Sequence, residues 1–259
     1  MSYGKVEVGS GFNWLTEAIG LVFRNPAAFL VMGLILAAIN LIPFLGGLAL
    51  TICGPALIGG VVFAAREESE GRKAEIPHLF RAFQEPGKIG PMLLLCLPAI
   101  AGGAVLLVCA LVFGVGALIG GGLSAASGSN AAGWGALGGS LLILCLIAIV
   151  IMFLVYALQF FAVPRVMLDG VEPFAAMKES LNACLANIGA FLVFGIVLFV
   201  AFFVLAIVLM LIPIIGWLAL VTVASVTVGC AEYIAYRQVY AGSASRMPPP
   251  APETPPVQG

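Results

Sequence analysis

The chain alternates between long stretches without charge and short segments that hold all of its charged residues. Residues 26–65, 89–164 and 180–231 contain no Asp, Glu, Lys, Arg or His. Each stretch is longer than the ~20 residues that one membrane-spanning helix needs, and each is interrupted near its middle by turn-forming residues. This pattern predicts three hairpins of membrane-spanning helices, with every charged residue on one side of the bilayer.

The interruptions define where each hairpin turns. The first stretch is interrupted at 41–47 (LIPFLGG) and the third at 212–217 (IPIIGW). Proline cannot continue a helix and glycine permits a tight reversal, so both sites are predicted turns. The second stretch is interrupted at 120–130, where Gly, Ser and Ala predict a flexible loop. The predicted spans lie near 27–43, 47–65, 91–118, 139–163, 188–212 and 217–236.

A short amphipathic segment precedes each hairpin. Its apolar residues recur at the spacing of one helical face. These residues are Leu15, Ala18, Ile19 and Val22 in the first, Ile76, Leu79, Phe80 and Phe83 in the second, and Phe174, Met177, Leu181, Cys184 and Leu185 in the third. A helix of this kind beside a span usually lies in the headgroup layer. The predicted fold is all-α: a polytopic membrane protein with six transmembrane helices in three hairpins, each preceded by an interfacial amphipathic helix.

The first and third hairpins resemble two copies of one unit. Residues 15–33 (LTEAIGLVFRNPAAFLVMG) align at a constant offset with 177–195 (MKESLNACLANIGAFLVFG), and the two share a Glu, an Asn and a closing Gly. After an insertion in the second copy, Pro43 aligns with Pro213. We therefore expect an internal duplication, in which the middle unit is assigned only by the order of its parts. The expected repeat units lie at about 14–66, 76–165 and 174–237 of a single membrane domain, 1–241.

Composition and charge place the chain in a membrane. Apolar residues make up 62% of it and charged residues only 9%, whereas soluble domains carry about 25% charged residues. Its Lys and Arg residues all lie outside the three hairpin turns, and basic residues favour the cytoplasmic side. We expect a multi-pass protein of the bacterial inner membrane with both termini in the cytoplasm. Residues 242–259 are rich in proline, which predicts a disordered cytoplasmic tail.

Several tracts together resemble a known group of proteins. They are the amphipathic opening at 14–25, the LIP-x-x-G turns, the segment IPHLFRAF at 76–83 and the tract PRVMLDGV at 164–171. Over residues 12–241 the chain is similar to an uncharacterised family of stand-alone bacterial six-span inner-membrane proteins. That family is related to the membrane domain attached to some glycerophosphodiester phosphodiesterases. The resemblance implies the fold and the compartment, and it brings no catalytic residue with it.

Sequence patterns typical of enzymes are missing. His78 is the single histidine, so no histidine pair is available for a metal, and the six cysteines form no C-x-x-C pair. The chain contains no G-x-S-x-G and no phosphate-binding G-x-x-x-x-G-K-[ST]. We expect a protein that is not an enzyme, with no cofactor, no metal and no nucleic-acid partner.

One ionisable residue falls inside a predicted span. Glu232 lies five residues before Arg237, hence about 7–8 Å inside the boundary at 1.5 Å per residue. At that depth it can reach the interface or pair with Arg66, Arg165 or Arg237, which is the structural interpretation. The alternative is a polar pocket open to the cytoplasm. It would bind a ligand through Glu232, Gln159, Tyr156 and Tyr233.

Three functions are compatible with these patterns. The leading hypothesis is a non-enzymatic membrane component that binds lipid, a membrane-protein partner or a second copy of itself. A transporter or channel for an uncharged or amphiphilic solute is the first alternative, although few polar residues lie at mid-membrane to line a pathway. A membrane-embedded lipid-modifying enzyme is the second, although no pair of catalytic residues reaches membrane depth.

The predicted topology can be tested by labelling. In a background without cysteines, single cysteines at Ser127 and Ser69 should react from opposite sides of the membrane, with Ser127 on the periplasmic side. The expectation follows from the distribution of Lys and Arg. Labelling of both positions from one side by a membrane-impermeant maleimide would exclude the six-span arrangement.

Overall fold

A computed structural model describes residues 3–126, 130–209 and 211–241. Within these residues all regular structure is helical, which confirms the all-α class. Five helices are long and apolar enough to cross a membrane, and a sixth span results if the bent pair at the N-terminus counts as one. The protein is therefore a helical, multi-pass membrane protein by the length and composition of its helices. The exact six-span layout stays a prediction.

Eleven α-helices and two short turns follow one another along the described residues. They are α1 (Ser10–Arg24), α2 (Pro26–Asn40), α3 (Leu45–Ser69), the 3₁₀ turn η1 (Ile76–Phe80), α4 (Arg81–Gln84), α5 (Ile89–Leu94), α6 (Leu97–Ala126), α7 (Asn130–Gln159), α8 (Ala162–Asp169), α9 (Pro173–Ala186), α10 (Ile188–Leu209), α11 (Pro213–Tyr236) and the π-helical turn η2 (Arg237–Ala241).

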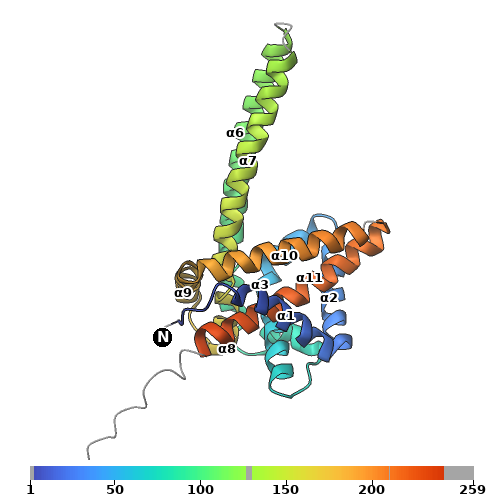
Figure 1. Ribbon diagram of the computed structural model, residues 1–259, viewed down its shortest axis with the longest axis vertical. Coiled ribbons are helices and arrows are strands. Elements are labelled where there is room, and N and C mark those ends of the chain that lie inside the picture. Colours follow the sequence, from blue (N-terminus) through green and yellow to red (C-terminus); the bar gives the residue numbers. More distant parts are fainter. Residues whose placement is uncertain (1–2, 127–129, 210, 242–259) are drawn as a thin grey trace, which may run out of the picture.

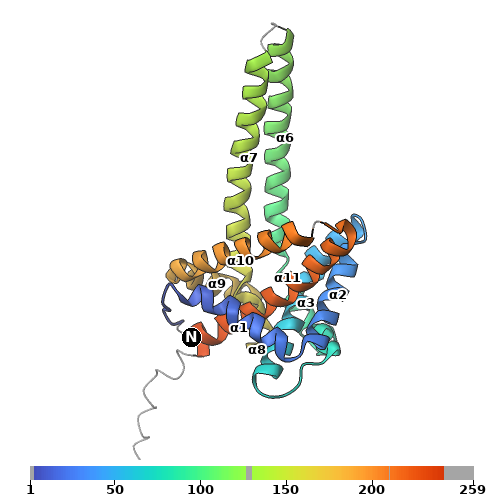
Figure 2. The same cartoon turned by 45° about the vertical axis from the view of Figure 1, so that its right-hand side comes forward.

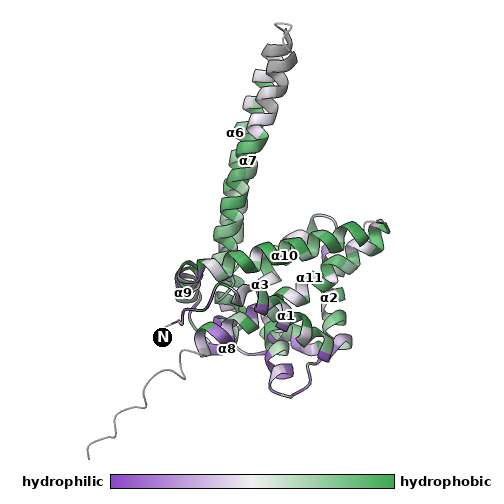
Figure 3. Ribbon diagram, viewed as in Figure 1, coloured by the Kyte–Doolittle hydropathy of each residue, from purple (hydrophilic) through white to green (hydrophobic). Residues whose placement is uncertain are grey.

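Three helical hairpins extend from a common polar region. We call this region, formed by α8, α9 and the segment after α3, the base. Hydrophilic residues gather at the base, around α8, α9 and the segment after α3, whereas the hairpins are hydrophobic (Figure 3). The hairpins α2–α3 and α10–α11 pack together, with α2 against α11, and α1 lies across α10 and α11. The hairpin α6–α7 projects away from them as a separate arm (Figures 1 and 2). Helix α6 packs along α7, and α7 contacts α9 near the base.

The predicted loop of the middle hairpin is largely wrong. The expected loop at 120–130 is helical up to Ala126 and again from Asn130. A helix satisfies its own backbone hydrogen bonds, which apolar surroundings require, and this requirement outweighs the low helix propensity of Gly and Ser. Ser127 lies in the segment 127–129, outside the described residues, as does the predicted disordered tail at 242–259.

The amphipathic segments differ in how far they match their prediction. Helices α1 and α9 form over two of them. In α1, Leu15, Ala18 and Val22 pack on protein and Ile19 is exposed; in α9, Met177 and Cys184 are buried, whereas Phe174 and Leu185 are exposed. The middle segment is not one helix, since η1 and the four-residue α4 replace it. Of its four predicted apolar residues only Leu79 is buried, because the short turns cannot present all of them to one side; Ile76, Phe80 and Phe83 are exposed.

The first and third hairpins share two local features. An Asn separates each amphipathic helix from its span, Asn25 before α2 and Asn187 before α10. Asn25 donates a hydrogen bond of 2.9 Å to the carbonyl of Ala74, and Asn187 donates one of 3.2 Å to the carbonyl of Gly4. Each Asn thus ties the junction to a distant segment of the chain.

The turns of the two hairpins are also alike in geometry. A Cβ added at Gly46 would meet the carbonyl oxygen of Ile39 at 1.9 Å, and one added at Gly216 would meet that of Leu209 at 1.9 Å. Only glycine fits so close to a backbone carbonyl. The spans before the turns differ in length, with 15 residues in α2 and 22 in α10.

The contact between α2 and α11 yields a prediction. A Cβ at Gly33 would lie 2.3 Å from the carbonyl oxygen of Thr222, whereas Gly195 in α10 has no atom within 4 Å of such a Cβ. Gly33→Ala should force the helices apart and lower the free energy of unfolding by about 1–3 kcal/mol. Gly195→Ala is the matched control and should leave stability unchanged or raise it. Thermal unfolding in detergent measures both, and equal effects would show that the close contact contributes nothing.

Candidate functional site

The four side chains that the sequence singles out lie on two helices and do not form one pocket. Tyr156 and Gln159 belong to α7, and Glu232 and Tyr233 belong to α11. Gln159 donates a hydrogen bond of 2.7 Å from Nε2 to the carbonyl oxygen of Leu95, just after the C-terminal end of α5. The end of a helix leaves carbonyls without partners, and Gln159 satisfies one of them. Its observed contact joins α7 to the break between α5 and α6.

Glu232 and Tyr156 lie inside the protein near one another. Glu232 is 5% exposed, and it is close enough for its charge to act on the Tyr156 hydroxyl. Among the described residues, neither Oε2 of Glu232 nor the hydroxyl of Tyr156 has a hydrogen-bond partner, although both atoms are buried. Buried polar atoms without partners cost stability, so this pair is a weak point of the fold.

Glu232 does not reach the arginines that the structural interpretation assigned to it. No ion pair among the described residues joins Glu232 to Arg66, Arg165 or Arg237, which have other carboxylate partners. The ion pairs among the described residues join Arg66 to Glu67 and Glu70, Arg165 to Asp169 and Glu179, and Arg237 to Glu17.

Cys184 lies near the Tyr156 hydroxyl. Cys184 lies in α9 and is fully buried, with Sγ 3.6 Å from the carbonyl oxygen of Ala157. Burial raises the pKa of the Cys184 thiol well above its ordinary value, so the thiol is neutral at pH 7.

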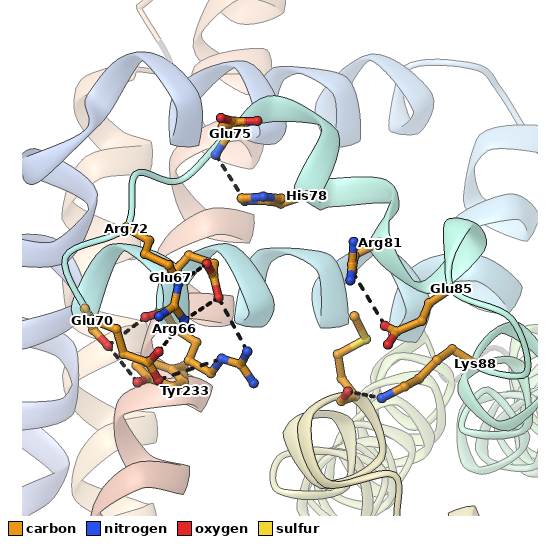
Figure 4. A network of polar contacts seen from close by, with 12 residues as sticks. Arg66, Glu67, Glu70, Arg72, Glu75, His78, Arg81, Glu85, Lys88 and Tyr233 are labelled. Atoms are coloured by element: carbon orange, nitrogen blue, oxygen red, sulfur yellow. Dashed lines mark hydrogen bonds and ion pairs between the residues drawn. The ribbon is translucent and has the colours of Figure 1, made fainter.

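Tyr233 lines a different site, a polar cavity of about 400 Å³ at the base, which we call the base pocket. Helices α3, α8 and α11 and the turn η2 form its walls. Its lining residues are Arg66, Ser69, Glu70, Leu168, Asp169, Tyr233, Tyr236 and Arg237. Figure 4 shows the side of the pocket formed by the end of α3, with Arg66, Glu70 and Tyr233 close together.

Hydroxyl groups connect the walls of the base pocket. The Ser69 and Tyr233 hydroxyls lie 2.7 Å apart and join α3 to α11. Tyr236 donates a hydrogen bond of 2.7 Å to Oδ1 of Asp169 and joins α11 to α8. Arg165, which is 3% exposed, binds the other carboxylate oxygen of Asp169. These contacts hold the tyrosine and aspartate side chains in place before any ligand arrives.

Arg66 in the pocket is less tightly paired than Arg72, which lies outside the lining. Glu67 is held chiefly by Arg72, and the carboxylates of Glu67 and Glu70 raise the pKa of Arg72 above its ordinary value. Arg66 is left with longer contacts, 3.4 Å to Glu67 and 3.8 Å to Glu70. Its Nε atom is buried without a hydrogen-bond partner among the described residues. An unpaired buried N–H is a ready donor for a ligand oxygen.

Of the residues of the base pocket, sequence reasoning assigned only Tyr233 to a ligand site and named Arg66 and Arg237 only as possible partners of Glu232. A signal for three of them was present, since Tyr233, Tyr236 and Arg237 stand at the i, i+3, i+4 spacing of one helical face at the end of the last span. Nothing in the sequence indicates that α3 and α8 complete the wall, because that depends on how the hairpins pack.

Three further cavities lined by described residues are apolar. One of about 270 Å³ runs between α7 and α10 and includes Phe153, Tyr156 and Phe191. Others lie within the hairpins α6–α7 and α10–α11. In the part of the chain that the structure describes, no group of three His, Cys, Asp or Glu side chains is placed to hold a metal ion. The base pocket is thus the described cavity with the most polar chemistry.

No protein-family model, curated protein or solved structure matches this chain. The resemblance to the six-span inner-membrane family stays a prediction.

The unpaired carboxyl of Glu232 gives a stability prediction. Glu232→Met has similar volume and removes a buried polar group without a partner, so it should raise the free energy of unfolding by about 1–3 kcal/mol. Glu232→Gln, the control, keeps a buried polar group and should change stability little. Thermal unfolding in detergent checks both. A loss of stability in Glu232→Met would show that the carboxyl has a partner, such as a bound ligand.

Gln159 gives a second prediction that separates packing from ligand binding. Gln159→Leu should lower stability by about 1 kcal/mol, because the Leu95 carbonyl loses its hydrogen bond. Any lipid that co-purifies with the protein should be unchanged, as mass spectrometry of the purified protein would show. If Gln159→Leu and Glu232→Gln both removed the same lipid at unchanged stability, these residues would be a ligand site.

Proposed function

We propose that this chain is a non-enzymatic, six-span protein of the bacterial inner membrane that binds the headgroup of a phospholipid in the base pocket. The observation that carries the proposal is the base pocket itself. It holds two guanidinium groups and two tyrosine side chains at the charged ends of helices that are apolar enough to cross a membrane. Headgroups occupy this level of a bilayer.

The charge pattern supports the proposed topology. Both ends of the described chain lie at the base, where the backbone N–H of Gly4 donates a 2.8 Å hydrogen bond to the carbonyl of Val239. Hydrophilic residues also gather on this side of the hairpins (Figure 3), and the Arg residues that form ion pairs there are Arg66, Arg165 and Arg237. Under the positive-inside rule, the base faces the cytoplasm together with both termini.

The shared features of the first and third hairpins support a duplication. An Asn at equivalent places and a glycine packed on a backbone carbonyl in each turn are specific requirements, unlike matches between apolar residues. Helix α10 has seven residues more than α2, which is two helical turns. In our proposal the membrane domain arose from hairpin units of this kind.

The dimensions and chemistry of the base pocket fit a headgroup. Its volume of about 400 Å³ lies in the range of small-molecule sites, which is roughly 300–1,000 Å³. Guanidinium groups bind phosphate oxygens strongly, often through two parallel hydrogen bonds. Arg66 offers a buried Nε that makes no hydrogen bond and lies 3.8 Å from Glu70, and Arg237 is half exposed beside the ring of Tyr233. A phosphodiester between them would gain charge-assisted hydrogen bonds.

Lipid binding can be measured with the full-length protein in detergent. Added phospholipid should raise the thermal unfolding temperature, because a ligand that binds the folded state stabilises it. The double variant Arg66→Gln, Arg237→Gln should need about tenfold more lipid for the same shift, as charge-assisted hydrogen bonds are lost. Arg24→Gln, Lys73→Gln is the matched control, since both residues are exposed outside the pocket. Equal responses of the two double variants would contradict the proposal.

A further inference from the structure

The hydroxyl protons of the base pocket can be assigned by counting. Ser69 has one proton, and its Oγ donates to the carbonyl oxygen of Arg66 at 3.0 Å. The contact of 2.7 Å between Ser69 and Tyr233 must then be donated by Tyr233. Since a tyrosine hydroxyl carries a single proton, the Tyr233 oxygen is left with lone pairs only.

The Tyr236 hydroxyl likewise has no proton left to donate to a ligand. Its single proton goes to Oδ1 of Asp169, so its oxygen can also only accept. Glu70 and Asp169, which line the same pocket, are carboxylates and accept as well. One part of the pocket therefore presents four side chains that have no proton to give to a ligand.

Donors stand beside these acceptors. The buried Nε of Arg66 has no hydrogen-bond partner among the described residues. The Arg237 guanidinium reaches Glu17 at 3.3 Å and stands 5.9 Å from the centre of the Tyr233 ring. The lining thus has two fixed positive groups and two fixed negative groups, and its net charge is zero. Arg72 and Arg165, which lie outside the lining, pair with Glu70 and Asp169, and the carboxylate oxygens keep lone pairs for a further donor.

We infer that the base pocket recognises a primary ammonium group next to a phosphodiester, the chemistry of an aminoethyl phosphate headgroup. The inference rests on the proposed phospholipid site and names its ligand class. The phosphodiester accepts from Arg66 and Arg237. The ammonium has three N–H donors and no acceptor, so it complements Tyr233, Tyr236 and the two carboxylates.

Two related headgroups fit the same lining less well. A trimethylated ammonium carries the same charge but has no N–H, so the oxygens of Tyr233 and Tyr236 gain no hydrogen bond from it. A glycerol headgroup has hydroxyl donors but no positive charge to set against Glu70 and Asp169. The pocket should therefore rank phosphatidylethanolamine above both phosphatidylcholine and phosphatidylglycerol.

The test compares these three lipids, with identical acyl chains, in thermal unfolding of the full-length protein in detergent. We expect phosphatidylethanolamine to act at about tenfold lower concentration than the other two, the equivalent of one charge-assisted hydrogen bond. Equal effects of the three lipids would overturn the inference and leave the proposed lipid binding intact. No effect of any lipid would overturn both.

Variants assign the preference to the pocket. Tyr236→Phe and, separately, Glu70→Gln should reduce the preference for phosphatidylethanolamine while the response to phosphatidylglycerol is kept. Glu70→Gln keeps the test decisive if Tyr236→Phe does not fold. Tyr156→Phe is the control, because its hydroxyl lies outside the pocket and has no hydrogen-bond partner. An unchanged preference in both pocket variants would overturn the inference.

Soluble glycerophosphoethanolamine distinguishes a lipid from a free metabolite of the same chemistry. Weaker binding of the soluble compound than of the lipid supports a membrane ligand. Equal binding would support the ammonium and phosphate recognition but would overturn the proposal that the ligand is a lipid.

Discussion

Backbone contact between α2 and α11 is the constraint on which the arrangement of the base depends. In hydrocarbon, apolar surface gains little from leaving lipid for protein, so helices associate through close packing and hydrogen bonds. Gly33 brings α2 against the backbone of Thr222 in α11. Helix α11 in this position also packs against α1 and α3, and it contacts α8. The base pocket forms where these helices end.

Polar side chains at the base and polar side chains deeper in the helices differ in whether they have partners. At the base, Arg165 is almost fully buried, yet carboxylates of two segments pair with it. Deeper in the helices, Glu232 and Tyr156 are left with buried atoms that have no partner among the described residues. The contrast shows that burial alone does not define a site. A site that is held in position by its own hydrogen bonds, like the base pocket, loses less order on binding a ligand.

The sequence predicts the helices better than it predicts their packing. Charge-free stretches and Pro-Gly turns identify the hairpins because lipid imposes those requirements on each segment separately. The prediction of a loop at 120–130 was wrong because Gly and Ser continue a helix when no water competes for the hydrogen bonds of the backbone. Glu232 and Tyr233 are neighbours in sequence but face opposite surroundings, one the protein interior and the other the base pocket. Contacts such as Tyr236 with Asp169 depend on helix packing, which no local pattern encodes.

The length of the α6–α7 arm links the protein to the thickness of its membrane. Each helix has 30 residues and is about 45 Å long, while the hydrocarbon layer of a bilayer is about 30 Å thick. A hairpin with such a mismatch must tilt or protrude, and the degree depends on the bilayer. Helix α7 leads directly into α8, whose Asp169 is one wall of the base pocket. The arm that must adapt to the bilayer is therefore continuous along the chain with one wall of the pocket.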